Sequence, residues 1–374
     1  FKTAWTYTYS DRKQRQFTSG ENLLSYKGQG YAYMNDQETT NWLGENTLTY
    51  SKTFNKDHSL NVVAGFTAEA SDYFNNNSSG KGFDIESLGY WNMGLANSSL
   101  LSVASGGNHS AIASWLGRVN YAYKGKYLAS VSFRADGSSK FAKNNKWGYF
   151  PSAALGWRIS EEDFMKDISW IQNLKLRASY GTSGNKTSDY LYGYQAFYEG
   201  GANYNGESGF RHSQLANPDL SWEKSKNFNV GLDFAVLNSR LHGSIDYYIK
   251  NSDELLLEKP LAGSTGLDII MSNLGGMRNS GIEVDLHSLN IQAGDFNWGT
   301  DFNISFNKNE ITSYPEEQEV VGTKVRTVGY SLYEFYMQEW AGVDKETGAP
   351  LWYKDVKDDK GNPTGERTTT STYS

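Results

Sequence analysis

The chain has 374 residues, no cysteine and a formal net charge of −7. The lack of cysteine excludes disulfide scaffolds and thiolate metal sites, and the acidic balance disfavours nucleic acid, whose phosphates attract clustered lysine and arginine. No stretch approaches the roughly 18 consecutive apolar residues of a membrane-spanning helix, so the length fits two or three ordinary domains or one large β-barrel.

The first half of the chain repeatedly carries apolar residues at every second position, which predicts β-strands. These strands are expected at residues 5–9, 48–54, 60–68, 115–123, 127–133, 147–159 and 174–180. Two polar stretches, Ser71–Ser110 and Gly137–Lys146, are predicted to be loops because they are rich in Asn, Ser and Gly. Pro151 cannot donate to a strand ladder, so we expect a bulge or a late strand start there.

A short helix is expected between the strands at 147–159 and 174–180. Ser160 is the predicted N-cap, and the acidic residues that follow it suit the first turn of a helix. Phe164 and Ile168 would share one face of this helix.

The second half of the chain continues the same pattern. Strands are expected at residues 228–234, 241–249, 282–286 and 296–306, with a tight turn at Asn238-Ser239. Long loops are predicted at Gly181–Glu223, in which Tyr190–Tyr198 is a candidate hairpin, and at Asn251–Arg278. Towards the end, Tyr330–Trp340 is a candidate strand, and Lys354–Thr372 is expected to be polar and mobile.

Three features together predict an all-β fold, a transmembrane antiparallel β-barrel of which about ten or eleven strands are present. The alternating runs reach about ten residues, as tilted membrane-crossing strands do. Short turns near residues 56, 125, 165, 238 and 292 alternate with long connections. Aromatic residues gather at strand ends beside tight turns, as interfacial girdles require: Tyr121, Tyr123, Tyr127, Phe296 and Trp298.

The alternation also predicts which side chains face lipid. Phe302, Ile304, Val230 and Leu232 are expected on the lipid side, and Asp301, Asn303, Asn229 and Asp233 on the lumen side. The alternative is a secreted, soluble β-sandwich that binds carbohydrate, because sandwich strands alternate in the same way. Sandwich loops, however, have no reason to alternate between long and short.

No residue pattern indicates catalysis, a metal site or a cofactor. The five histidines are scattered, and His242 and His287 fall on the polar face of their strands, where lining a lumen is the simpler role. Asp355, Asp358 and Asp359 with Gly361 lack the spacing of a calcium loop. Glu283 and Asp285 share one strand face, as many inward carboxylates of a water-filled barrel do.

Five motifs resemble the SusC/RagA-type TonB-dependent transporters. They are FRADGSSKF at Phe133–Phe141, WGYFPSAALGWRIS at Trp147–Ser160, LKLRASYG at Leu174–Gly181 followed by Gly184-Asn185, NPDLSWE at Asn217–Glu223, and NLGGMRNSGIE at Asn273–Glu283. The combination spans roughly residues 115 to 310. These motifs concern the barrel scaffold, and they mark no binding residue.

The resemblance implies a barrel in the outer membrane of a Gram-negative bacterium that imports oligosaccharides or peptides. Such transporters have about 22 strands, so residues 1–374 would form about half of the barrel wall, with the N-terminal plug and the C-terminal strands missing. The implied partners are a SusD-like surface lipoprotein, the TonB complex through the missing N-terminal region, and outer-membrane lipid.

The long loops, at Ser71–Ser110, Gly181–Glu223, Asn251–Arg278 and after Asn307, would lie together on the extracellular side, because successive crossings put every second connection on the same side. Their aromatic residues Tyr190, Tyr192, Tyr198 and Tyr204 are candidates for stacking on a substrate, although they would equally pack the loops together.

Overall fold

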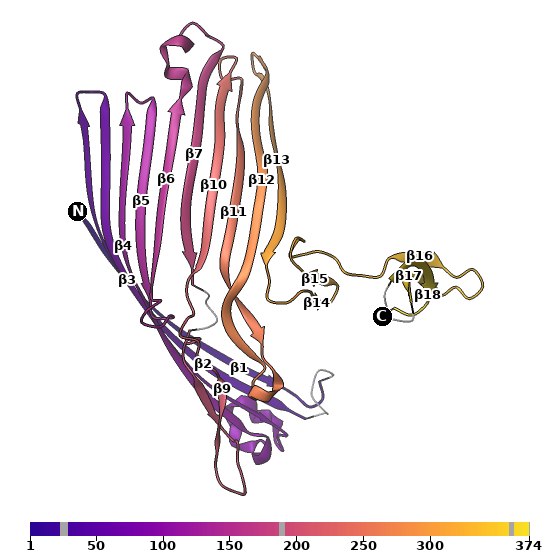
Figure 1. Cartoon of the computed structure of the whole chain (residues 1–374). Coiled ribbons are helices and arrows are strands. Elements are labelled where there is room, and N and C mark those ends of the chain that lie inside the picture. The colour runs from indigo at the N-terminus through magenta and orange to yellow at the C-terminus, as the bar shows by residue number, and fades with distance from the viewer. Residues whose placement is uncertain (23–28, 187–190, 359–362, 374) are drawn as a thin grey trace.

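The computed structural model describes residues 1–22, 29–186, 191–358 and 363–373. One curved antiparallel sheet dominates it (Figure 1). From one edge to the other this sheet runs β1 (Lys2–Thr18), β2 (Tyr31–Phe54), β3 (His58–Lys81), β4 (Ser102–Tyr123), β5 (Tyr127–Ser138), β6 (Trp147–Arg158), β7 (Ile171–Asn185), β10 (Glu223–Val236), β11 (Leu241–Pro260), β12 (Ile269–Ala293) and β13 (Phe296–Ser313). These 11 strands confirm the predicted strand count. No helix in the described part of the chain is long and apolar enough to cross a membrane.

The described residues also form three small sheets, one between β7 and β10 and two after β13, and several 3₁₀-helices. The small sheets pair β8 (Phe197–Gly200) with β9 (Phe210–Gln214), β14 (Glu319–Val321) with β15 (Lys324–Arg326), and β16 (Trp340–Val343) and β18 (Pro363–Thr370) with the central β17 (Pro350–Lys357). The 3₁₀-helices are η2 (Glu86–Trp91), η3 (Met93–Leu95), η4 (Ser98–Leu100), η5 (Ile159–Glu161), η6 (Asp163–Met165) and η7 (Gly263–Thr265).

The register of the large sheet keeps apolar and polar side chains on opposite faces. Leu176, Leu232, Ile245, Val284 and Ile304 are successive cross-strand partners on five strands, so they share one face. Their neighbours in sequence form the matching row on the other face, which is polar.

The apolar face, which we call the outer face, is not covered by a second sheet in the described part of the chain. Leu155 is 66% exposed and Phe302 is 49% exposed, as expected for side chains that meet lipid. The β-sandwich alternative is therefore wrong, because a sandwich buries such a face between two sheets.

The short turns lie together at one end of the sheet, at the top of Figure 1, as the turn spacing predicts. Backbone hydrogen bonds join these turns to the next turn or to the neighbouring strand end: Lys124 N–H donates to the Asp57 carbonyl (2.6 Å), Arg158 N–H to Lys126 (2.8 Å), Leu237 N–H to Trp170 (2.7 Å) and, within β12, Leu289 N–H to Arg240 (2.7 Å). The predicted aromatic residues lie at this end, where Trp298 is 53% exposed and Tyr127 47% exposed.

Two long loops predicted from composition contain much more strand than expected. The Ser71–Ser110 prediction is wrong for half of its length, because β3 continues to Lys81 and β4 begins at Ser102 and pairs with it residue by residue. The Asn251–Arg278 prediction is wrong for the same reason: β11 continues to Pro260 and β12 begins at Ile269. The predicted loop at Gly137–Lys146 is confirmed, since β5 ends at Ser138 and β6 begins at Trp147.

The expected helix after β6 is wrong in kind. Two single-turn 3₁₀-helices, η5 and η6, replace it, and Ser160 lies inside η5 without capping it. Glu162 separates the two with an extended backbone (φ −76°, ψ 150°). Its carboxylate accepts hydrogen bonds from Tyr127 Oη (2.6 Å), Trp157 Nε1 (2.9 Å) and Lys126 Nζ (3.3 Å). These contacts tie the turn to β5 and β6 and interrupt the helix.

The strand pairing tests four further predictions. The expectation at Pro151 is wrong, because β6 begins earlier, at Trp147, and pairs with β5 through Pro151 without a bulge; only the ladder between β6 and β7 starts after it, at Ser152. The candidate hairpin at 190–198 is wrong in position, because β8 begins at Phe197 and pairs with residues after 209. The candidate strand at 330–340 is wrong except for its last residue, and Lys354–Thr372 carries most of β17 and β18.

Candidate functional site

The inner face of the sheet carries a connected ion-pair network centred on Arg177. Its Nε donates to both oxygens of Asp233 (2.9 and 3.0 Å), and its Nη2 lies 2.9 Å from Oδ2 of Asp246. Lys175 lies 3.5 Å from the same Asp233 carboxylate. These side chains remain partly exposed, so the network lines an aqueous surface instead of being buried as a core.

A glycine makes this network possible. Arg177, Gly231 and Asp246 are direct cross-strand partners on β7, β10 and β11. A Cβ atom on Gly231 would lie 2.4 Å from Oδ1 of Asp246 and 2.7 Å from the guanidinium carbon of Arg177. The missing side chain is what lets the guanidinium reach across β10 to the carboxylate on β11.

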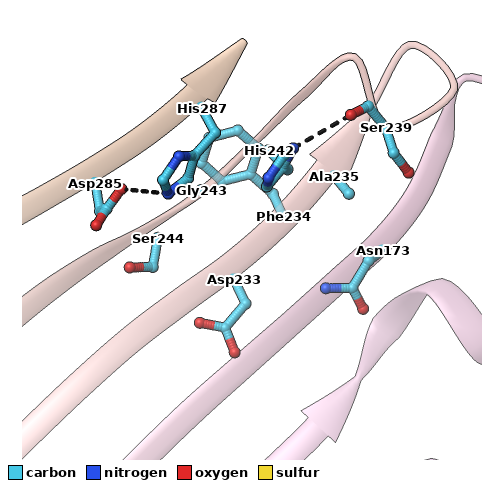
Figure 2. Close-up of a pocket in the computed structure, with 10 residues that line it drawn as sticks. All are labelled: Asn173, Asp233, Phe234, Ala235, Ser239, His242, Gly243, Ser244, Asp285 and His287. Atoms are coloured by element: carbon cyan, nitrogen blue, oxygen red, sulfur yellow. Dashed lines mark hydrogen bonds and ion pairs between the residues drawn. The ribbon is translucent and has the colours of Figure 1, made fainter. Parts of the chain in front are cut away.

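Nearer the short turns, His242 and His287 line an open hollow of about 520 Å³ on the same face (Figure 2). The two rings stack with centroids 5.1 Å apart and an interplanar angle of 19°. Nε2 of His287 lies 2.8 Å from Asp285, and its Nδ1 lies 2.7 Å from Asp301. Both contacts are hydrogen bonds only when both ring nitrogens carry hydrogen.

The sequence predicted this polar face correctly: His242, His287, Asp285, Asp301 and Asp233 all lie on it. It did not predict that β10, β11, β12 and β13 bring them together. The described residues contain no group of three or more histidine and acidic side chains arranged to hold a metal ion. The residues that line the hollow are mainly polar.

At the opposite end, the long connections are held by a small core that we call the mouth cluster: Phe141, Phe150, Leu220, Trp222 and Met271. Phe141 is 2% exposed and Leu220 is 1% exposed, in contrast to the open outer face. The Trp222 ring lies 5.3 Å from Phe141 and 5.6 Å from Phe150, and its Nε1 donates to the Lys146 carbonyl (3.0 Å).

Asparagines complete the mouth cluster with hydrogen bonds to backbone. Nδ2 of Asn217 donates to the Met271 carbonyl (2.6 Å). Asn273 accepts from Ser221 N–H (2.9 Å) and donates to the carbonyls of Ser221 (2.9 Å) and Glu254 (2.8 Å). The motifs at Asn217–Glu223 and Asn273–Glu283 therefore lock loops together, which explains why they carry a family pattern but no ligand chemistry.

A second set of contacts, which we call the Glu86 clamp, holds the connection between β3 and β4. The carboxylate of Glu86 accepts from Ser19 Oγ (2.5 Å) and from Gly20 N–H (2.8 Å), beyond the end of β1. These two donors hold the pKa of Glu86 below its usual range. Ala32, Phe83 and Ala96 are buried together beside it.

The four candidate substrate tyrosines have different surroundings. Tyr190 lies outside the described residues. Tyr192 Oη both accepts from His109 N–H (2.9 Å) and donates to the His109 carbonyl (3.0 Å), so it packs the loop against β4. The Tyr198 ring packs against His212 with ring centroids 4.2 Å apart and an interplanar angle of 35°, and Tyr198 is 63% exposed; Tyr204 is 86% exposed.

The sequence model of the family described as "TonB dependent receptor-like, beta-barrel" matches residues 1–373. The chain belongs to this family. "TonB-dependent receptor P39" of Formosa agariphila is 36% identical over 348 residues, which are 92% of this chain and 33% of the relative. "TonB-dependent receptor SusC" of Bacteroides thetaiotaomicron is 35% identical over 264 residues, which are 65% of this chain and 26% of that protein.

Solved structures agree with these relatives and support the SusC/RagA type. "Structure of the RagAB peptide transporter" superposes with a TM-score of 0.84 at 28% identity, and covers 100% of this chain and 41% of that one. The "open-open" state of the RagAB peptide importer gives a TM-score of 0.85 at 27% identity, over 100% of this chain and 40% of that one. The chain spans about a third of the length of the first curated relatives that it matches.

Proposed function

We propose that this chain forms part of the wall of an outer-membrane, TonB-dependent importer of oligosaccharides or peptides. The observation that carries the proposal is the separation of an uncovered apolar outer face from a hydrogen-bonded polar inner face over 11 strands. A wall of this kind separates lipid from an aqueous passage. Import through it requires no covalent chemistry, which fits a chain with no catalytic motif.

In this proposal the long connections face the cell exterior and receive a SusD-like surface lipoprotein. The mouth cluster and the Glu86 clamp support the role, since they fix these connections as a shaped surface. A plug that contacts TonB and further barrel strands would be supplied by other parts of the protein. The relatives titled as a RagAB peptide transporter favour peptides as cargo.

Tyr198 and Tyr204 are the substrate-contact candidates that remain open to solvent, whereas Tyr192 is engaged with β4. Tyr190 stays a prediction from the sequence. Aromatic side chains with exposed faces can stack on sugar rings or pack against apolar peptide side chains.

The full-length protein, produced in a Gram-negative host, tests the proposal by uptake of candidate glycans and peptides. Uptake should require TonB, and removal of residues 197–214 should impair it while the barrel still assembles, because surface loops carry function more than stability. Replacing Tyr192 with Phe, which removes the contacts with His109, is the matched control for loop packing. Protein that is extracted from cells without detergent would contradict the membrane assignment.

Protease added to intact cells tests the orientation independently. Cleavage in the connection between β7 and β10, but not at the Lys124-Gly125-Lys126 turn, is expected. The reverse pattern would invert the topology and remove the extracellular role of the mouth cluster.

A further inference from the structure

β4 extends far beyond its neighbour on one side. It pairs with β3 up to Ser102 opposite Ser79, but its pairing with β5 stops at Ile112 opposite Ser138. In the described part of the chain no strand therefore pairs with Ser102–Ala111 on this side, which we call the free edge of β4 and which lies at the same end of the sheet as the long connections.

The direction of the backbone groups along this edge follows from two contacts. Ser139 N–H donates to the Ala111 carbonyl (2.9 Å), and Ser139 Oγ accepts from Ala111 N–H (2.9 Å). Tyr192 Oη makes the equivalent two contacts with His109. At these two positions Ser139 and Tyr192 therefore make the hydrogen bonds that a neighbouring strand would make. Because Ala111 and His109 are both odd-numbered, the backbone N–H and C=O groups of the odd-numbered residues in this part of β4 point to the free edge.

The next three odd-numbered residues, Val103, Ser105 and Gly107, are exposed. Their edge-facing N–H and C=O groups have no hydrogen-bond partner in the described part of the chain. Successive groups of this kind repeat about every 6.8 Å along a strand. A row of alternating donors and acceptors at that spacing is complementary to another extended polypeptide.

We propose that the free edge of β4 at Val103–Gly107 is a strand-addition site for an extended segment of a separate polypeptide. The occupant would continue the ladder that β5 begins and that Ser139 and Tyr192 extend. This proposal does not depend on which cargo the barrel imports.

The side chains along the edge favour a bulky apolar residue opposite Gly107. Phe74, the β3 partner of Gly107, is 51% exposed, and one of its ring carbons lies 3.5 Å from where a Cβ atom on Gly107 would be. Elsewhere in the sheet, Trp5 lies over its partner Gly44 and Trp147 over its partner Gly137. An aromatic residue of the occupant would cover Gly107 in the same manner and pack on Phe74.

The test uses the full-length protein in detergent and a fluorescein-labelled peptide of alternating threonine and valine with one central phenylalanine. Fluorescence anisotropy should show saturable binding. The same peptide with alternate amides N-methylated along one edge keeps its side chains but cannot pair, so it should bind at least about fivefold more weakly, since each hydrogen bond contributes modestly.

Two variants locate the binding on β4. Ser105→Pro removes an edge-facing N–H and leaves the β3 ladder intact, so it should weaken binding by at least about fivefold. Ser105→Ala keeps the backbone group and should leave binding unchanged. Phe74→Ala should weaken the phenylalanine peptide but not a peptide with valine in its place.

Equal affinity of the plain and N-methylated peptides for the unmodified protein would overturn the proposal, whatever the folding of the variants. Absence of saturable binding by the plain peptide would overturn it as well. If Ser105→Pro and Ser105→Ala weakened binding equally, the peptide would be contacting the serine side chain and not the backbone edge, which would also refute strand addition.

Discussion

Arginine in place of Phe302 should destabilise the folded barrel far more than arginine in place of the adjacent Asn303. Phe302 lies on the outer face of β13, six positions after Phe296 and six before Lys308. Those two residues bound the apolar stretch, with Phe296 beside the short turn and Lys308 paired to Glu310 beyond the apolar band.

The expected magnitude follows from this position. Six residues span about 20 Å along a strand, which is about 15 Å of membrane depth at a tilt of about 40°. Phe302 therefore lies near the middle of an apolar band about 25–30 Å tall, where an arginine costs about 2–4 kcal/mol. Asn303 points to the polar face opposite Asp285, so Asn303→Arg should cost less than about 1 kcal/mol.

The assay is a urea titration of full-length protein folded into lipid vesicles, followed by tryptophan fluorescence. Phe302→Leu serves as a further control, because it shortens the side chain without placing a charge in lipid. Penalties of similar size for Phe302→Arg and Asn303→Arg would refute the assignment of faces, and with it the membrane position of the sheet.

Three other perturbations test separate parts of the structure. Gly231→Ala should cost about 1–3 kcal/mol, because its Cβ atom would collide with the Arg177–Asp246 pair; urea titration measures this. Donors from Tyr127, Trp157 and Lys126 hold the pKa of Glu162 below its usual range. The ionised Glu162 carboxylate therefore stabilises the folded state above the usual glutamate pKa, and this contribution is lost as the pH falls through the lowered pKa. Glu162→Gln should thus lower the thermal midpoint near neutral pH but not in acid. Trp222→Ala should locally cost about 3–5 kcal/mol and expose the 139–146 connection to limited proteolysis, without loss of the barrel.

Each of these has a control. Gly117→Ala should be nearly neutral, since the nearest atom to its Cβ position is 4.0 Å away. If Gly117→Ala and Gly231→Ala cost the same, the absence of a side chain at Gly231 is not what permits the Arg177–Asp246 pair. Trp91, which is 82% exposed, should tolerate alanine without new cleavage at 139–146. A pH-independent effect of Glu162→Gln would show that packing, and not the charge, holds the turn.

The sequence predicts the membrane-crossing part of the fold well, because there each strand must alternate between lipid and water. Asn303 and Phe302 are separated correctly by that rule alone, and the tight turn at Asn238-Ser239 follows from residue preference. The pairing of two strands joined by a short turn also follows, since such a turn is too short to reach any other neighbour.

Beyond the apolar band this signal disappears. Residues 75–79 read Asn-Asn-Asn-Ser-Ser, a composition typical of loops, yet they continue β3 because β2 and β4 supply hydrogen bonds on both sides. With water on both faces, no alternation is required, and pairing alone maintains the strand. Similarly, β11 continues past a break in register near Glu254, whose backbone is left-handed (φ 57°).

The candidate site was partly predictable for related reasons. Alternation places His242, His287 and Asp285 on the inner face, but their contacts depend on the register between β11, β12 and β13. The mouth cluster was missed because Phe141 and Trp222 lie outside any alternating run, where an isolated aromatic residue gives no signal of burial. The pairing of NPDLSWE with NLGGMRNSGIE as mutually bonded segments was not visible in either motif alone.

The backbone bonds that link the short turns with one another and with β12 bear on how the wall responds to mechanical load. A sheet yields most easily when its ladders open one bond at a time from an end. The contacts from Lys124 to Asp57, Arg158 to Lys126, Leu237 to Trp170 and Leu289 to Arg240 tie together the ends at which such opening would start. Force applied near this rim must therefore break several ladders together, in shear. At the opposite end the contacts are local, in the mouth cluster and at Glu86, and do not run from strand to strand along the rim. Deformation of the wall should therefore concentrate among the long connections.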